Sequence, residues 1–544
     1  MAVRLPAALR SLLRLAPPTL LALHGPLALL AANLGVVEPS SAARSLLISA
    51  LFGILVTLAA LAFLRKQEAA VVLAGVFILL FFAYGHAYDW IRAQAVWANE
   101  VARHRYLAPA AAILALGVGG IAYRQPRLAA PLFTWITVIG WALVALSMGR
   151  ILQAQLPSWG KEGRAWAASS AQAIQDTDLS LPDIYYIILD GYGREDVLRQ
   201  LYGYDNAEFI HWLESKGFQV GQDSMSNYSQ TGLSLASSLN MIYLDDLAAK
   251  MGPESYDRGP LSDLVEGNEV FALARSFGYR LVVFDSGIPY TQFREAEVYF
   301  EPDYQALDEQ RSSLYPTLAL NQFEGLLLET SLTKAILDPY RRGLWQQAPG
   351  VFDADYRRQR ERVLFALSNL SEVADFAEPT LAFAHIVSPH PPFVFGSQGE
   401  EVLQDVPYHL GATDDYYPTD EYVERYKSQI EYVTRLVQVE IGELLDASER
   451  PPIIVVQGDH GPSGHVDWNH PDESGLRERM SILNAYHLPG PDAPAVRPEM
   501  SPVNSFRLIF DAYLGTTFGE LPDISYFSTY PRPYRFTVVE PSDR

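Results

Sequence analysis

Near its carboxyl end the chain reads IIVVQGDHGP over residues 453–462, an apolar run that ends in the adjacent pair Asp459-His460. Gly461 and Pro462 stop the strand that this run predicts. Side chains on a strand alternate between faces, so two neighbours converge only where the strand gives way to a loop. A carboxylate and an imidazole brought together there suit a borderline divalent cation such as Zn²⁺ or Mn²⁺. Asp-His dipeptides also occur in ordinary turns. The pair therefore indicates a metal site only together with candidate residues elsewhere in the chain.

Three other apolar runs end in polar residues of the same kind. They cover residues 184–189, 281–284 and 381–384, and helix-like segments separate them. Short, nearly continuous apolar runs are typical of strands buried on both faces. We therefore predict an α/β domain with a mainly parallel sheet between helices and right-handed crossovers. Ligands bind such sheets outside the carboxyl ends of the strands. One rim of the sheet should collect the polar residues that follow the strands: Asp190, His385, His390, Asp459 and His460.

A hydroxyl nucleophile is predicted after the first of these strands. Residues 226–240 read SNYSQTGLSLASSLN, in which polar residues lead into a helix of small side chains. Thr231 should lie near the amino end of that helix, where backbone N–H groups and the helix dipole favour an anion such as phosphate. A metal-bound hydroxyl there can lose its proton and attack phosphorus. The alternative is that Thr231 only caps the helix, which would contribute about 1 kcal/mol.

These candidate residues occur in an order that resembles the alkaline phosphatase and sulfatase superfamily: Asp190, Thr231, His390, Asp459 and His460. The order is most similar to the membrane-embedded branch that includes lipoteichoic acid synthases and phosphoethanolamine transferases. The resemblance covers about residues 182–490 and the preceding membrane region. It implies an alkaline phosphatase-like fold with one divalent metal, Zn²⁺ or Mn²⁺, held by four residues: Asp190, Thr231, Asp459 and His460. It further implies that Thr231 is the nucleophile and that His390 contacts the substrate phosphate.

Two departures from the family pattern bear on the reaction. The membrane-embedded branch often has Glu at the first metal position, whereas this chain has Asp190, as hydrolytic members do. A sulfatase needs a Cys or Ser within a Cys/Ser-x-Pro-x-Arg stretch. This chain has no Cys, and nothing around Thr231 has that form, which disfavours sulfate ester hydrolysis. His385, His465 and His470 supply part of a second ligand set, so the sequence leaves a second metal open.

Four further side chains are candidate substrate contacts: Asn227, His385, His465 and Arg479. Asn227 is able to donate to a phosphate oxygen or to hold its own turn. Arg479 is able to clamp a phosphate oxygen or to pair with a neighbouring glutamate such as Glu478. The sequence alone does not separate these alternatives.

The amino-terminal third predicts a transmembrane domain over residues 1–155. Apolar stretches, each near the roughly 20 residues that a helix needs to cross the hydrocarbon core, cover residues 15–36, 45–64, 69–91, 107–123 and 129–149. Five such runs in succession favour five transmembrane helices over a buried core or a cleaved signal peptide. Basic residues in the short loops slightly favour a cytoplasmic amino terminus. With five spans, the carboxyl-terminal domain of this multi-pass protein would then lie outside the cytoplasm.

The rest of the chain has a different composition. We expect residues 156–181 to be a linker, which alternatively forms a helix on the membrane surface, and residues 182–544 to be the catalytic domain. The net charge is −22, yet residues 1–155 hold 12 basic and 4 acidic side chains, so the acidity lies in the remainder. An acidic domain without a broad basic face is not suited to nucleic acid. A lipid headgroup would therefore have to enter a local pocket.

The sequence predicts a membrane-anchored, metal-dependent phosphotransferase. Its Thr231 would take a phosphate from a phospholipid headgroup, as a phosphothreonine, and pass it to an envelope glycan or another alcohol. The main alternative is a membrane-tethered phosphodiesterase or phosphatase in which water is the acceptor. A sulfatase and a non-catalytic binding module are the less favoured interpretations.

Overall fold

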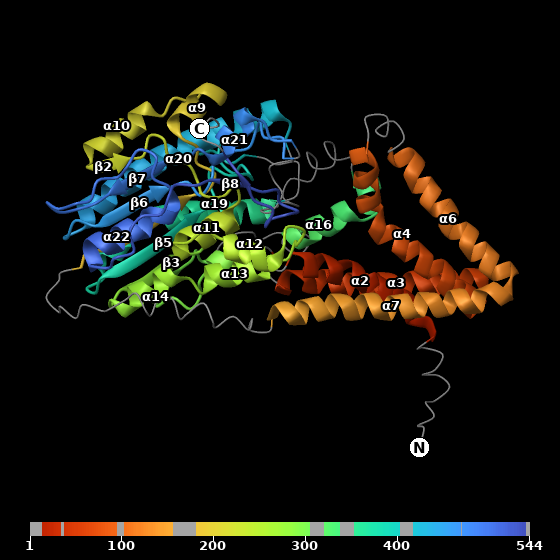
Figure 1. The fold of residues 1–544 in the computed structure, drawn as a ribbon. Helices are drawn as coiled ribbons and strands as arrows, with labels where there is room; N and C mark the ends of the chain where they lie inside the picture. The colour runs from red at the N-terminus through yellow and green to blue at the C-terminus, as the bar shows by residue number, and fades with distance from the viewer. Residues whose placement is uncertain are drawn as a thin grey trace, which may run out of the picture. The chain divides into compact units, whose positions relative to one another are not determined.

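The computed structural model describes residues 14–33, 37, 39–94, 103–155, 181–304, 320–337, 353–402, 408, 417–468 and 470–539. The chain divides into two compact units, a helical unit and an α/β unit (Figure 1). The helical unit takes the described residues up to 155 and, from far along the chain, residues 320–337, 353–355 and 408. The predicted catalytic domain runs over 182–544 without a break, whereas residues 320–337 cluster with the helical unit; the domain boundaries stay a prediction. The predicted linker, apart from its last residue, lies outside the described residues.

The helical unit is built mainly from five helices of the amino-terminal region: α2 (Pro17–Ala32), α3 (Ala43–Leu64), α4 (Gln67–Gln94), α6 (His104–Arg124) and α7 (Pro126–Gln155). A 3-10 helix, η1 (Pro39–Ala42), leads into α3. Two short helices from later in the chain, α16 (Gln322–Thr330) and α17 (Thr333–Leu337), also belong to this unit.

Four helices in the described part of the chain are long and apolar enough to cross a membrane. They are Pro39–Leu64, Gln67–Ile91, His104–Arg124 and Pro126–Leu152. The first predicted span forms only the apolar helix α2, whose 16 residues are fewer than the roughly 20 that the hydrocarbon core requires. Pro17 and Pro18 open this helix and Pro26 lies inside it. The predicted count of five spans is not confirmed.

The α/β unit contains one seven-stranded sheet in the order β2-β7-β6-β1-β5-β3-β4. Its strands are β1 (Ile184–Leu189), β2 (Phe218–Val220), β3 (Arg280–Phe284), β4 (Val298–Phe300), β5 (Thr380–Ile386), β6 (Ile453–Gln457) and β7 (Asn484–His487). Parallel pairs join β6, β1, β5, β3 and β4, while β7 pairs antiparallel with β6 and with β2. The central strands are those that the apolar runs predict, so the mainly parallel sheet is confirmed. A separate two-stranded sheet joins β8 (Tyr526–Phe527) and β9 (Thr537–Val538).

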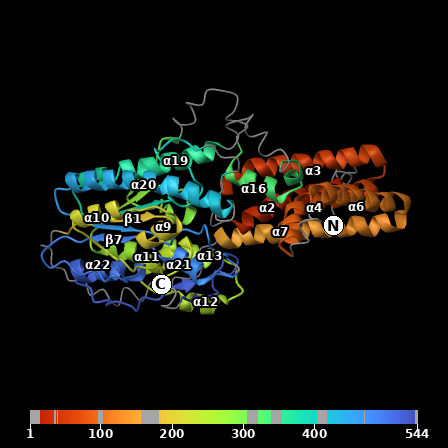
Figure 2. The ribbon, with the colours of Figure 1, turned by 90° about the horizontal axis from the view of Figure 1, so that it is seen from above.

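Helices cover both faces of the larger sheet. The longer helices of the α/β unit, in chain order, are α9 (Glu195–Leu201), α10 (Ala207–Ser215), α11 (Thr231–Asn240), α12 (Asp245–Met251), α13 (Gly259–Glu266), α14 (Glu269–Ser276), α19 (Asp353–Ser368), α20 (Thr419–Ala447), α21 (Glu473–Met480) and α22 (Ser505–Leu514). Short 3-10 helices lie between them: η2 (Pro289–Thr291), η4 (Ser371–Asp375) and η5 (Pro502–Asn504). Figure 2 shows α19 and α20 on one side of the sheet and α11, α13 and α22 on the other.

The helix that carries Thr231 packs closely on the sheet. Tyr186 of β1 shares a core with apolar residues of α11, α13, α14 and α22. Ser238 of α11 brings its hydroxyl to 3.2 Å from the Tyr186 hydroxyl, which also lies 2.9 Å from Gln457 Oε1 on β6. Small side chains on α11 thus let the helix lie against β1 and β6, as the sequence predicts.

Candidate metal centre

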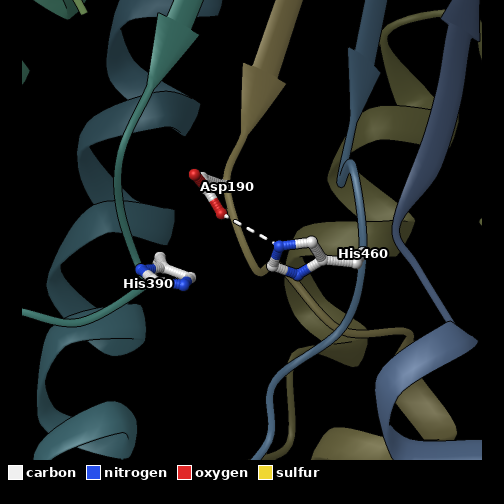
Figure 3. A group of neighbouring side chains, drawn as sticks. All are labelled: Asp190, His390 and His460. Atoms are coloured by element: carbon white, nitrogen blue, oxygen red, sulfur yellow. Dashed lines mark ion pairs between the residues drawn. The ribbon is translucent and has the colours of Figure 1, made fainter. Parts of the chain in front are cut away.

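Three loops and one helix meet at the carboxyl edge of the parallel strands. Asp190 directly follows β1, while Asp459 and His460 follow β6. His390 lies in the segment after β5, and Thr231 is the first residue of α11. Figure 3 shows the Asp190 carboxylate turned toward the His460 ring, with His390 on the neighbouring segment. Asp190, His390 and His460 each offer one ligand atom within 4.8 Å of the other two. The structure therefore brings these predicted residues together.

Three candidate ligands each have one side-chain oxygen or nitrogen that a neighbouring group holds in place: Asp190, Asp459 and His460. Asp190 Oδ2 lies 3.2 Å from His385 Nε2. Asp459 Oδ1 accepts a hydrogen bond of 3.1 Å from the backbone N–H of Gly191. His460 Nδ1 donates to its neighbour's backbone carbonyl at 3.0 Å, which leaves the lone pair on Nε2. Such outer hydrogen bonds are typical of metal ligands, because they fix the orientation of the ligating atom.

The second oxygen of each carboxylate and the Thr231 hydroxyl all lie close to the other ring nitrogen of His460. Asp190 Oδ1 and Asp459 Oδ2 are buried and have no hydrogen-bond partner among the described residues. His460 Nε2 lies 3.6 Å from the first oxygen, 3.4 Å from the second and 3.1 Å from Thr231 Oγ1. Ligands bound at about 2.0–2.2 Å to a tetrahedral Zn²⁺ lie about 3.3–3.5 Å apart. Buried carboxylate oxygens without partners are costly, and one divalent cation at this point would satisfy both.

Thr231 is not the cap of its helix. Gln230 occupies the N-cap position of α11, and no side-chain capping hydrogen bond is present there. The Thr231 hydroxyl instead lies beside His460 Nε2. The capping alternative is therefore wrong, and the first backbone N–H groups of α11, which have no partner within the helix, open next to the same point.

The electrostatics of the site favour ionised Asp190 and neutral His460. Burial opposes ionisation of Asp190, but the neighbouring His390, the hydrogen bond from His385 and the nearby His460 together lower the pKa of Asp190. Burial and the Arg479 guanidinium lower the pKa of His460. A charged carboxylate and an uncharged imidazole are the forms in which these side chains bind metals.

His385 lies inside β5 rather than after it, because the strand continues to Ile386. The side chain is buried and lies between Asp190 Oδ2 and Thr291 Oγ1, which is 3.2 Å from its Nδ1. It therefore orients Asp190, and its contact with a substrate stays a prediction. Asp190, His385 and Asp459 form a second possible ligand group. This group shares only Asp190 with the first group, Asp190, His390 and His460, so a second metal stays open.

Arg479 reaches the centre from α21. Its Nε donates to the Ser229 carbonyl at 2.8 Å, and its Nη1 donates to the Gly461 carbonyl at 3.1 Å. The other amino group, Nη2, lies 3.1 Å from His460 Nε2. The guanidinium is buried, and these backbone contacts hold it rigidly against the candidate ligands. Arg479 thus lies beside the candidate ligand His460, and its contact with a phosphate stays a prediction.

Asn227 and His465 have structural partners. The Asn227 amide is buried, donates to Ser501 Oγ and to the Ile524 carbonyl at 2.9 Å each, and accepts from Val503 N at 2.7 Å. These bonds tie the segment before α11 to the carboxyl-terminal region, and a contact between Asn227 and a phosphate stays a prediction.

His465 Nδ1 lies 3.3 Å from Oε1 of Glu478. The hydrogen bond to the buried Glu478 carboxylate raises the pKa of His465. The imidazole therefore belongs to an ion pair on α21, although its side chain keeps about a third of its surface exposed.

Tyr290 is a site residue that the sequence reasoning missed. It lies on η2, after β3, and its hydroxyl would be 3.7 Å from a side-chain carbon added at Gly232, next to Thr231. Burial, with smaller contributions from the Tyr530 ring and the Asp190 carboxylate, raises the pKa of Tyr290 well above its usual range. The phenol therefore stays protonated and is able to donate a hydrogen bond at the start of α11. No motif marks this tyrosine, because only the fold brings η2 to α11.

No protein-family model matches the chain, and no curated protein matches it. Solved structures do resemble it. The C-terminal periplasmic domain of EcEptC from Escherichia coli, in complex with Zn, has a TM-score of 0.37 and 11% identity, and covers 66% of this chain and 92% of that one. A 2-O GAG sulfatase has a TM-score of 0.35 and 12% identity, with 65% and 74% covered.

The periplasmic domain of the phosphoethanolamine transferase EptC from Campylobacter jejuni has a TM-score of 0.30 and 12% identity, and covers 57% of this chain and 81% of that one. The solved structures that resemble this chain thus include both sulfatases and phosphoethanolamine transferase domains. Likeness at this level carries no argument about activity, so the functional conclusion rests on the geometry of the metal centre.

Proposed function

We propose that this chain is a membrane-anchored, metal-dependent phosphotransferase of the alkaline phosphatase and sulfatase superfamily. The observation that carries the proposal is the 3.1 Å contact between Thr231 Oγ1 and His460 Nε2, beside two buried carboxylate oxygens that lack hydrogen-bond partners among the described residues. A non-catalytic binding module needs no hydroxyl at a metal site. The contact therefore favours an enzyme whose nucleophile is Thr231.

The residues fit one divalent cation, Zn²⁺ or Mn²⁺, held by Asp190, Asp459, His460 and the Thr231 oxygen. When bound, such an ion lowers the pKa of a coordinated hydroxyl and offsets charge on phosphate oxygens. Both carboxylates offer an oxygen and the imidazole offers a lone pair, which is the mixed N/O donor set that these metals accept.

The protein groups around the hydroxyl define the remaining steps. The Thr231 hydroxyl gives its proton to solvent, and Oγ1 attacks phosphorus, so an O–P bond forms to the threonine while the P–O bond to the leaving alcohol breaks. His390 donates the proton that the leaving oxygen takes. Arg479 and the first N–H groups of α11 stabilise negative charge on the equatorial oxygens. A second alcohol then gives its proton to His390, which has lost its own, and attacks the phosphothreonine. An O–P bond forms to this acceptor while the O–P bond to Thr231 breaks, and Thr231 regains a proton from solvent.

The helical unit bears on the donor and the acceptor. Four helices of membrane length attach the chain to a bilayer, and phospholipid headgroups are the phosphodiesters that are abundant at its surface. A tethered active site gains effective concentration for such a donor. We infer that the donor is a phospholipid headgroup, that the acceptor is an envelope glycan or another alcohol, and that the amino terminus is cytoplasmic while the α/β unit is extracytoplasmic.

The competing function is hydrolysis, in which water replaces the acceptor alcohol. Asp190 favours it, because hydrolytic members of the superfamily carry Asp at the first metal position, where membrane-embedded transferases often carry Glu. Both reactions use the same first step, so both predict a phosphorylated Thr231.

The proposal is tested by trapping that intermediate. Purified full-length chain is incubated with headgroup-labelled phospholipid and Mn²⁺, quenched in acid and digested, and the label is mapped by mass spectrometry. We expect label on Thr231 and none in Thr231→Ala, whereas Thr419→Ala should label like the wild type. Thr419 is a matched control, since it is an exposed threonine that also begins a helix.

The outcome that rejects the proposal is full turnover of the phospholipid by Thr231→Ala. In the wild type, release of free labelled headgroup phosphate without any transfer to an added alcohol assigns the enzyme as a hydrolase.

A further inference from the structure

A segment that is distant in sequence from the spans belongs to the helical unit. Residues 320–337 lie between strands β4 and β5 in the chain order, yet they cluster with the apolar helices. The segment consists of α16, which starts in a capping box formed by Asn321 and Glu324, and α17. Its sequence from Phe323 to Leu337, FEGLLLETSLTKAIL, is largely apolar with a few charged positions.

Polar contacts attach the segment to the start of α3. Glu324 is 5% exposed, and both of its carboxylate oxygens accept hydrogen bonds from the Arg44 guanidinium. The side chain of Asn321 donates to the Ser41 carbonyl at 3.0 Å. Phe323 is fully buried in a core that includes Leu27 of α2. A bidentate arginine–carboxylate pair next to a buried aromatic side chain fixes the orientation of the segment on the helices.

A second set of contacts joins the segment to α4. The backbone N–H of Leu332 donates to the Phe81 carbonyl at 2.8 Å. A side-chain carbon at Gly85 would lie 2.4 Å from the Glu329 carbonyl, so only glycine permits this approach. Lys334 Nζ lies 2.8 Å from Asp89 Oδ1.

These contacts place the segment at one end of the spans. Ser41 and Arg44 stand at the beginning of the span Pro39–Leu64, while Asp89 stands near the end of the next span, Gln67–Ile91. Two consecutive helices that pack antiparallel bring the end of the second beside the start of the first. Aromatic side chains are enriched at the boundary between lipid and water, and this end of α4 carries Tyr84, Tyr88 and Trp90.

The segment also exposes apolar surface at that level. Ile336 is 64% exposed, and Leu326, Leu327 and Leu328 are partly exposed. On α3, Leu47 at 63% exposure continues the apolar surface of the spans. Helices with an exposed apolar face and a few charges suit the boundary between headgroups and acyl chains.

We propose that residues 321–337 are an interfacial membrane anchor, whose exposed apolar side chains enter the acyl-chain region of the lipid leaflet at that end of the spans. The occupant of this surface is phospholipid, because the surface is continuous with helices of membrane length. The chain thus returns from the α/β unit to the membrane region and leaves it again. The inference does not depend on the proposed chemistry.

The test uses the absence of cysteine from the chain. Single-cysteine variants of the full-length protein are labelled with an environment-sensitive fluorophore and reconstituted into phosphatidylethanolamine–phosphatidylglycerol vesicles. Ile336→Cys reports on the anchor. Leu55→Cys, 64% exposed on α3, is the lipid-facing reference, and Val439→Cys, 54% exposed on α20, is the aqueous reference.

The proposal is tested by measuring how strongly a lipid-phase quencher and an aqueous quencher reduce the fluorescence of each label. Brominated acyl chains should quench the label at position 336 at least about half as strongly as the label at position 55, and aqueous iodide should quench it several-fold less than the label at position 439. If iodide quenches position 336 as it quenches position 439, while brominated lipid leaves it bright, the anchor is ruled out. Phospholipid turnover is not part of the readout, so failure of the anchor is distinguishable from failure of the proposed function.

Discussion

At the scale of single residues, the centre depends on two carboxylates, Asp190 and Asp459. Each has one oxygen held by a neighbouring group and one oxygen without a hydrogen-bond partner among the described residues. The main-chain N–H of Gly191 fixes Asp459, and Gly191 itself adopts φ +74, a conformation that favours glycine. His385 fixes Asp190 in the same way from β5. The open atoms then face one another within 3.1–3.6 Å of His460 Nε2. Removing an orienting group should therefore weaken metal binding even though the four proposed ligands are kept.

His385→Gln tests this orientation. Loss of the imidazole leaves Asp190 Oδ2 without its neighbour, and loss of an outer hydrogen bond to a metal ligand typically costs about 10–100-fold in metal affinity. We expect Zn²⁺ affinity, measured by competition with a chromophoric chelator, to fall by about that factor. His211→Gln, at an exposed position on α10, should leave the affinity unchanged. An unchanged affinity in His385→Gln would show that Asp190 needs no such support.

Tyr290→Phe tests the tyrosine beside α11. If the hydroxyl donates to a substrate oxygen in the transition state, its removal should lower kcat about 10-fold or more, as loss of a single oxyanion donor does. KM should change little, and metal content should not change. Tyr256→Phe, 66% exposed, is the control. A kcat equal to that of the wild type would make Tyr290 a packing residue only.

At the scale of elements, an ion pair ties the end of β3 to α19. Asp285 is buried and lies 3.0 Å from Arg362 Nε, and the Tyr299 hydroxyl donates to it at 2.9 Å. Burial alone would raise its pKa, but Arg362 and the tyrosine hydrogen bonds lower the pKa of Asp285 below its usual value. A carboxyl with a lowered folded pKa stabilises the protein above its unfolded pKa, and this stability is lost as pH falls through the folded pKa.

The thermal midpoint should report this linkage. At pH 7 in detergent, Asp285→Asn should melt below the wild type, because the ion pair is missing. The difference should shrink as pH falls below about 4, the usual pKa of an aspartate. A difference that stays constant between pH 7 and pH 3 would mean that the carboxylate charge contributes no stability at this position.

Gly85→Val tests the docking of α16 and α17 on α4. The added carbon would meet the Glu329 carbonyl at 2.4 Å, so the segment should detach, and limited proteolysis should cut within residues 320–337 at least several-fold faster. Gly117→Val is matched in chemistry, since it lies in a helix of the same unit where an added carbon meets nothing within 4 Å. Equal cleavage rates in the two variants would contradict the close approach.

At the scale of the whole molecule, the sequence predicts what local patterns determine. Apolar runs that end in polar residues predict the central strands, and they also predict that Asp190 and Asp459 follow strand ends. Both features depend only on a few neighbouring residues in the sequence. The predicted count of five spans is not confirmed, because α2, with Pro17, Pro18 and Pro26, is a helix of 16 residues. Apolar composition alone did not reveal that shortening.

Contacts between distant segments were beyond local patterns. Asn227 has the same sequence signature whether it binds phosphate or, as observed, holds Val503 and Ile524. Tyr290 approaches α11 only through the crossover after β3. The sequence from Phe323 to Leu337 does not indicate by itself that the segment belongs to the helical unit. That placement depends on partners about 240–280 residues away in the chain, such as Arg44.

The most direct test of the metal centre is the metal content of the purified chain. Wild type, Asp459→Asn and Thr419→Ala are purified without added chelator, equilibrated with limiting Zn²⁺ or Mn²⁺ and analysed by inductively coupled plasma mass spectrometry. Four donor groups around one point predict about one ion per chain in the wild type and in Thr419→Ala, and far less in Asp459→Asn. No bound metal in the wild type, or undiminished metal in Asp459→Asn, would contradict the centre and the chemistry proposed for Thr231.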